Sequence, residues 1–101
     1  MPDALRETAD NVIPVWGLMP DEWLKIIAQA QKLIRQGRAS DVGEVRHGAY
    51  ICVYDRHGAP YTVGREQRVL HLLGPTGETI AIGKTLDAII DALDSSLQPY
   101  N

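Results

Sequence analysis

A pattern that recurs at an offset of 19 positions constrains the fold of this chain more than any other feature of its sequence. Residues 50–65 and residues 69–84 each hold five strand-like residues, a four-residue turn ending in glycine, and a second strand with apolar residues two apart. The turn glycines are Gly58 and Gly77, and a hairpin turn of this length commonly ends in a residue with positive φ. The two copies therefore predict two tandem β-hairpins.

Two amphipathic helices flank the predicted hairpins. Residues 20–36 show the apolar period of an α-helix, with Pro20 suited to the first turn and Gly37 to the C-terminal stop. A second helix is expected over residues 86–97, with Thr85 as its N-cap. We expect five side chains on the inner faces of these helices to be buried: Trp23, Ile27, Ile34, Ile90 and Leu93.

The order helix, hairpin, hairpin, helix is typical of the α+β class. The expected architecture is a four-stranded antiparallel meander packed by an N-terminal and a C-terminal helix. Residues 50–54 are expected to pair with 61–65, and residues 69–73 with 80–83. The polar residues 38–44, between the first helix and the first hairpin, are interpreted as a loop.

The chain is interpreted as an N-terminal segment, residues 1–19, followed by a single α+β domain, residues 20–101. Pro14 excludes a helix that continues through the segment. Residues 12–19 are nevertheless too apolar to be left in water. We therefore expect the segment to dock on the domain or on a partner.

Composition indicates an ordinary globular protein, with 45% apolar and 23% charged residues in a chain of 101. Cys52 is the only cysteine, which excludes an intrachain disulfide and a thiolate metal site. The acidic residues 1–10 lack the basic and apolar parts of a secretion signal. The longest uncharged apolar stretch, residues 12–19, is far shorter than the roughly 20 residues that a membrane span needs. We therefore expect a cytoplasmic protein without a membrane partner.

The candidate catalytic motifs are incomplete. The sequence Gly83-Lys84-Thr85 has Glu78 where a phosphate-binding loop needs its first glycine. Cys52 and His71 share one face of the predicted sheet, but no third group is placed to orient the histidine. The three histidines are ten and fourteen residues apart, which matches no compact metal-ligand motif. We therefore expect no enzymatic activity, no cofactor and no bound metal.

The predicted sheet has an unusually apolar second face. If Ile51, Val53, Leu70 and Leu72 face the helices, strand alternation turns a second set of residues the other way. A face in contact with solvent should be polar. Three kinds of cover remain open: residues 12–19, one helix on each side of the sheet, or another chain. The second set is Tyr50, Cys52, Tyr54, Val69, His71 and Leu73.

Tyrosine-rich apolar surface of this kind is typical of protein interfaces. The leading hypothesis is therefore a non-enzymatic protein-interaction or regulatory module that binds another protein, or itself as a homodimer, through the sheet. The expected protein-binding residues are Tyr50, Cys52, Tyr54, His71 and Trp16.

The charge distribution supports an alternative hypothesis of nucleic-acid binding. Residues 25–71 carry eight Lys or Arg against four acidic residues, although the whole chain has a net charge of −3. Arginines at hairpin turns and strand ends can contact phosphates. The residues expected to do so are Arg46, Arg56, Arg65 and Arg68. A small enzyme or ligand-binding protein is a third hypothesis.

Overall fold

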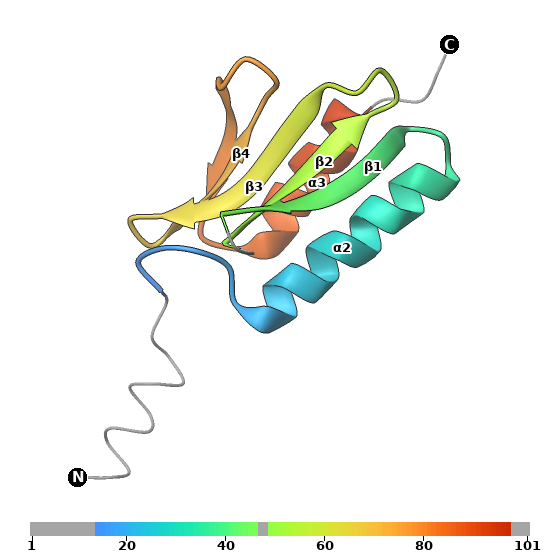
Figure 1. Cartoon of the computed structure of the whole chain (residues 1–101). Helices are drawn as coiled ribbons and strands as arrows, with labels where there is room; N and C mark the ends of the chain where they lie inside the picture. Colours follow the sequence, from blue (N-terminus) through green and yellow to red (C-terminus); the bar gives the residue numbers. More distant parts are fainter. Residues whose placement is uncertain (1–13, 47–48, 98–101) are drawn as a thin grey trace, which may run out of the picture.

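The computed structural model describes residues 14–46 and 49–97, and they form an α+β fold (Figure 1). The strands form one antiparallel sheet in the order β1-β2-β3-β4-β5, so the chain meanders from one edge to the other. The elements, in chain order, are α2 (Pro20–Arg35), β1 (Ala39–Val45), β2 (Tyr50–Asp55), β3 (Pro60–Glu66), β4 (Val69–Leu73), β5 (Thr79–Gly83) and α3 (Leu86–Ser96).

Both helices pack on the same face of the sheet. Helix α2 contacts β1 and β2, α3 contacts β4 and β5, and the two helices contact each other. Side chains of both helices share one buried cluster with the inward residues of the strands, including Ile51, Val63 and Leu72. Neither helix of the described part of the chain has the length and apolar content needed to cross a membrane.

The expectation of a four-stranded sheet and a loop at residues 38–44 is wrong, because Ala39–Val45 forms a fifth strand, β1. This strand lies at the edge of the sheet and pairs with β2, with Val42 opposite Val53. Only Ala39 is buried along it, while Asp41 and Glu44 are exposed. An edge strand with one solvated side needs few apolar residues, so its sequence resembles a polar loop.

The two predicted hairpins are confirmed, with Gly58 at φ +87° and Gly77 at φ +85°. In the first hairpin the pairing is shifted by one residue from the expected register, so that Tyr54 lies opposite Pro60. The Asp55 carboxylate accepts hydrogen bonds from the backbone N–H groups of His57 and Ala59, which closes the turn just before Pro60. The strand therefore begins one residue earlier than the repeat predicts.

The helices pack through a narrower stripe than the sequence predicts. The fully buried residues of α2 are Ile26, Ala30 and Leu33, and Leu93 is buried in α3 as expected. Trp23, Ile27 and Ile34 lie half-buried at the margin of the core, and Ile90 lies half-buried outside it. The expected burial of these four side chains is therefore corrected, because the central row of each helix meets the sheet and the flanking rows meet solvent.

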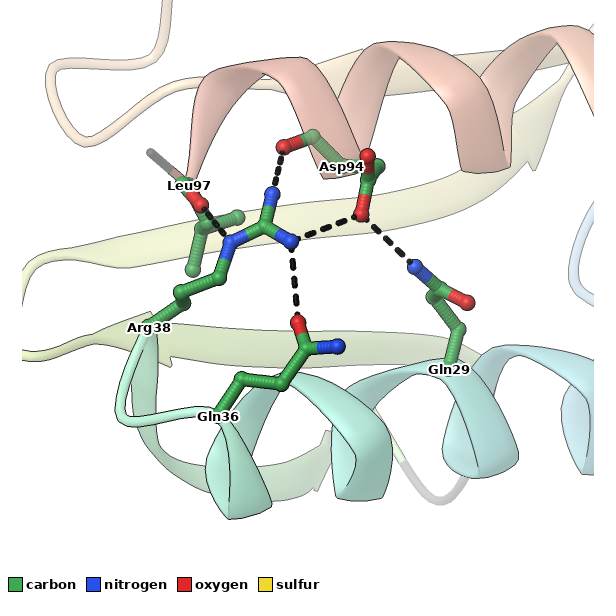
Figure 2. A network of polar contacts seen from close by, with 5 residues as sticks. All are labelled: Gln29, Gln36, Arg38, Asp94 and Leu97. Carbon is green, nitrogen blue, oxygen red and sulfur yellow. Dashed lines mark hydrogen bonds and ion pairs between the residues drawn. The ribbon is translucent and has the colours of Figure 1, made fainter. Parts of the chain in front are cut away.

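Arg38 joins the ends of both helices to the start of β1 (Figure 2). Its guanidinium donates hydrogen bonds to the backbone carbonyls of Leu97, at 2.6 Å, and Asp94. It also donates to the Gln36 side chain and pairs with the Asp94 carboxylate at 3.2 Å, which in turn accepts a hydrogen bond from Gln29. The last turn of α3 has no basic residue of its own, so Arg38 supplies the positive charge that its free carbonyls favour.

Arg65 is the one buried charged residue among the residues described, with 2% of its surface exposed. Its guanidinium donates to both carboxylate oxygens of Glu22, at 2.8 and 2.6 Å, and to the Gly17 carbonyl. Glu22 also accepts a hydrogen bond from the Met19 backbone N–H at the start of α2. This ion pair fixes the beginning of α2 against β3, the central strand.

The first prediction concerns the core. Ile89 is fully buried and Ile90 is not, so Ile89→Ala should lower the free energy of unfolding by about 2–5 kcal/mol through cavity formation. Its neighbour Ile90→Ala is the matched control and should cost about 1 kcal/mol or less. Urea denaturation of both variants provides the measurement, and equal losses would contradict the packing described here.

The second prediction concerns acid stability. Burial raises the pKa of Glu22, but hydrogen bonds from Arg65 and Met19 and the charge of Arg65 outweigh it and lower that pKa below its ordinary value of 4.5. Glu22 therefore stabilises the fold above about pH 4.5, and this contribution is lost as the pH falls through its folded-state pKa. Glu22→Gln should remove this part of the acid dependence and cost roughly 3–5 kcal/mol at neutral pH, since Arg65 stays buried without a counter-charge.

Unfolding free energies between pH 3 and 7 measure both effects, with the range set about the ordinary glutamate pKa. The control is Asp21→Asn, an exposed neighbour in the same turn of α2, which should cost only about 0.3–1 kcal/mol through the helix dipole. A Glu22→Gln variant with the stability and acid profile of Asp21→Asn would show that the ion pair does not stabilise the fold.

Candidate protein-binding site on the open face of the sheet

The face of the sheet opposite the helices, here called the open face, is covered by neither helix. Strand alternation and the observed register place on it residues from all five strands, with Asp41 and Val45 of β1 opposite Tyr54 and Tyr50. Most of these side chains are apolar or aromatic, which is unusual for a solvated face. The principal ones are Tyr50, Cys52, Tyr54, Thr62, Val69, His71, Leu73, Ile80 and Ile82.

Tyr50 organises one end of the open face. Its ring lies across the backbone of Gly64, where an added Cβ would come within 2.0 Å of the Tyr50 Cδ2 atom. Its hydroxyl donates a hydrogen bond of 2.8 Å to the Glu66 carboxylate. The Trp16 ring meets it edge-on, with centroids 5.8 Å apart, and the Arg46 guanidinium lies over it at 5.5 Å. Tyr50 is therefore held by contacts with four residues and forms one wall of the site.

The segment before α2 covers only this end of the face. The Gly17 N–H donates to the Arg65 carbonyl and the Arg68 N–H donates to the Val15 carbonyl, each at 3.1 Å. Trp16 pairs with Glu66 in an isolated bridge and keeps 52% of its surface exposed. Residues 14–19 thus lie along the end of β3, whereas residues 1–13 of the proposed N-terminal segment fall outside the described part of the chain.

A hollow of about 180 Å³ opens in the middle of this face. Gly64 on β3 belongs to its lining, opposite His71 on β4, and the Tyr50 ring from β2 occupies the space that a Gly64 side chain would fill. Its walls combine apolar surface with hydroxyl, imidazole and carboxylate groups. The lining residues are Tyr50, Thr62, Gly64, Glu66, His71, Leu73 and Thr79.

The tyrosines of the open face are held in the neutral form. Burial, together with the hydrogen bond to Glu66 and its charge, raises the pKa of Tyr50. The hydrogen bond with Cys52 raises the pKa of Tyr54. Cys52 itself is buried, with 4% of its surface exposed. Both tyrosine hydroxyls can therefore donate and accept hydrogen bonds at neutral pH.

The structure places the five sequence-predicted residues on the open face or at its end, and their side chains differ in solvent exposure. Tyr50 and Cys52 are buried, Tyr54 and His71 are half-buried, and Trp16 is half-exposed. The sequence analysis missed the exposed Ile80 and Ile82 of β5, which stand 39% and 60% exposed. Alternation along β5 could have placed Ile82 beside His71, its observed partner on β4.

The four arginines of the nucleic-acid hypothesis do not share one surface. Arg46 and Arg68 lie in the β1–β2 and β3–β4 turns, at one end of the sheet. Arg56 lies in the β2–β3 turn, at the opposite end. Arg65 is not available to phosphates at all, because it is buried against Glu22. The meander therefore places the arginines of one basic segment of the sequence at opposite ends of the sheet, and Arg65 in the interior.

The remaining candidate motifs are the histidines, of which His47 lies outside the described residues, and the sequence Gly83-Lys84-Thr85. No group of three or more His, Cys, Asp or Glu residues in the described part of the chain could hold a metal ion. Gly83 ends β5 and Thr85 sits at the N-cap of α3 without a side-chain cap hydrogen bond, so this stretch is a strand-to-helix junction.

No family model matches the chain, and comparisons with curated proteins and with solved structures find no significant match.

The third prediction concerns the Tyr50–Gly64 contact that shapes the hollow. Gly64→Ala should destabilise the protein by about 1–3 kcal/mol, because its new Cβ overlaps the Tyr50 ring. In a Tyr50→Ala background the same change should cost far less, since the overlapping ring is gone. Thermal and urea unfolding of the four proteins of this double-mutant cycle measure the coupling. Additive losses would show that the two residues do not meet.

Proposed function

We propose that this protein is a non-enzymatic protein-interaction module that binds a partner protein on the open face of its sheet. The observation that supports the proposal most strongly is the one-sided packing of the fold. Both helices cover the same side, and among the described residues the opposite side carries aromatic and aliphatic groups around a hollow. Ile80 and Ile82 are 39% and 60% exposed beside this hollow, and exposed apolar patches can mark interaction sites.

The geometry of the hollow fits the anchor of a protein interface. Interfaces concentrate their binding energy where one side chain enters a well-packed pocket on the other protein. Here Tyr50 and Leu73 offer apolar contact, while Thr62, His71 and Glu66 offer hydrogen-bonding groups at the rim. An aromatic or aliphatic partner side chain with a polar tip would satisfy both kinds of group.

The fixed position of Tyr50, one wall of the hollow, also supports binding. Tyr50 is fixed by Gly64, Glu66 and Trp16, so little side-chain entropy remains to be lost there when a partner docks. The wall residue Thr62 lies between Cys52 and Leu73 on adjacent strands. A preformed site of this kind needs no rearrangement of the backbone.

The fourth prediction tests this proposal with a matched pair of variants. Thr62→Lys places a charged chain over the hollow and can extend into solvent, so the fold should be kept. Thr85→Lys introduces the same residue at an exposed N-cap whose side chain makes no cap hydrogen bond. Proteins captured by the wild type are identified by mass spectrometry, purified and titrated by calorimetry. Thr62→Lys should weaken binding at least about tenfold, whereas Thr85→Lys should leave it unchanged.

Two results would contradict the proposal. Equal affinity of both variants for the purified partner would exclude the hollow as the docking site. Capture that disappears after nuclease treatment and falls steeply with rising salt would favour the nucleic-acid hypothesis instead, because phosphate contacts are strongly salt-dependent.

A further inference from the structure

The outer edge of β5 is unusual for the edge of a sheet. In the order β1 to β5 this strand has β4 as its neighbour on one side and no strand on the other among the described residues. Helix α3 packs against β4 and β5 on one face of the sheet. An edge strand presents a row of backbone N–H and C=O groups that can pair with another strand.

Edge strands of natural proteins usually carry charges or proline that prevent such pairing. Strand β1, at the other edge, follows this rule, since Asp41 and Glu44 are exposed on it. Strand β5 has the sequence Thr-Ile-Ala-Ile-Gly, without any charge or proline. Ile80 and Ile82 are among the most exposed large apolar side chains that the structure describes. Both edge strands have an irregular register, but only β1 adds exposed charges, so β5 is the less protected edge.

The sequence of β5 is self-complementary about Ala81. When the strand is paired antiparallel with an identical copy around this residue, Ile80 of each copy lies opposite Ile82 of the other. Ile82 lies on the open face opposite His71, and Ile80, at the register irregularity of β5, is 39% exposed, so both side chains can meet those of the second copy across the junction. Thr79 would lie opposite Gly83, where no side chain obstructs it.

The charges that flank β5 favour the antiparallel direction. Glu78 precedes the strand and the exposed Lys84 follows it. In the antiparallel arrangement each Glu78 lies at the end that holds Lys84 of the second copy, whereas parallel pairing would bring like charges together. The pairing of β4 with β5 is irregular where Leu72 lies opposite Ala81 and Leu73 lies opposite Thr79. Residues 81–83 keep a regular register with β4.

We propose that β5 pairs antiparallel with β5 of a second copy of this chain, joining the two sheets into one continuous sheet with two-fold symmetry. The symmetric contact uses the same edge of both copies, and the acidic β1 edges remain outside it, so the assembly closes as a dimer. The inference goes beyond the proposed function, because it concerns the edge of the sheet and holds whether or not the open face binds a partner. In the dimer the two open faces, each with its hollow, form one extended surface.

The fifth prediction tests the dimer on the purified full-length protein by sedimentation equilibrium over a range of concentrations. The wild type, with a chain mass of 11.2 kDa, should approach about twice that mass. Ile82→Lys should raise the dimer dissociation constant at least about tenfold while keeping the melting temperature of the monomer. The control is Leu24→Lys on the outer surface of α2, because Leu24 is 63% exposed and Ile82 is 60% exposed. This control should remain dimeric.

A second variant tests the register. With Cys52 replaced by alanine, Ile80→Cys together with Ile82→Cys should form an intermolecular disulfide on mild oxidation, and mass spectrometry should find residue 80 linked to residue 82 of the other copy. A wild type that remains monomeric, a dimer that Ile82→Lys does not weaken, or open-ended fibres would overturn the proposal. If Thr62→Lys dissociates the dimer and Ile82→Lys does not, the edge pairing is wrong, and the open face is the self-association site.

Discussion

The buried ion pair between Arg65 and Glu22 connects the parts of this structure that determine the site. Arg65 comes from the central strand, and Glu22 from the first turn of α2, 43 residues away in the sequence. The same guanidinium holds the Gly17 carbonyl, and the same carboxylate holds the Met19 N–H. A buried charge must keep its partner, because an unpaired one is strongly destabilising. The pair therefore fixes where α2 begins and where the preceding segment runs, which brings Trp16 against Tyr50.

The open face depends on a second constraint, the absence of a side chain at Gly64. Any Cβ at this position would overlap the Tyr50 ring. With glycine there, the ring lies flat across β3 and the hydroxyl reaches Glu66. The ring then forms one wall of the hollow, whose lining also includes Thr62 and His71. Gly64 thus allows the aromatic wall of the proposed docking site to form.

Features with a local cause could be predicted from the sequence. The turn glycines Gly58 and Gly77 require positive φ, and the apolar period of residues 20–36 requires a buried helical face, so both appear where expected. The exact register of the first hairpin could not be predicted. It depends on the Asp55 carboxylate, which bonds two backbone N–H groups inside the turn. Gly58 indicates where the turn lies, but the sequence alone does not show which residue ends it.

By itself, the sequence determined the α+β class, the two hairpins, the two helices and the alternation that gives the sheet two apolar faces. These depend on neighbours a few residues apart, where backbone geometry leaves few choices. Only the tertiary structure decided that residues 39–45 join the sheet as an edge strand, that both helices lie on one side, and that Arg65 is buried while Ile82 is exposed. These outcomes depend on contacts between residues far apart in the chain. Arg65 is buried because it lies on the helix side of the central strand beside Glu22, whereas Ile82 is exposed because it lies on the open face of an edge strand.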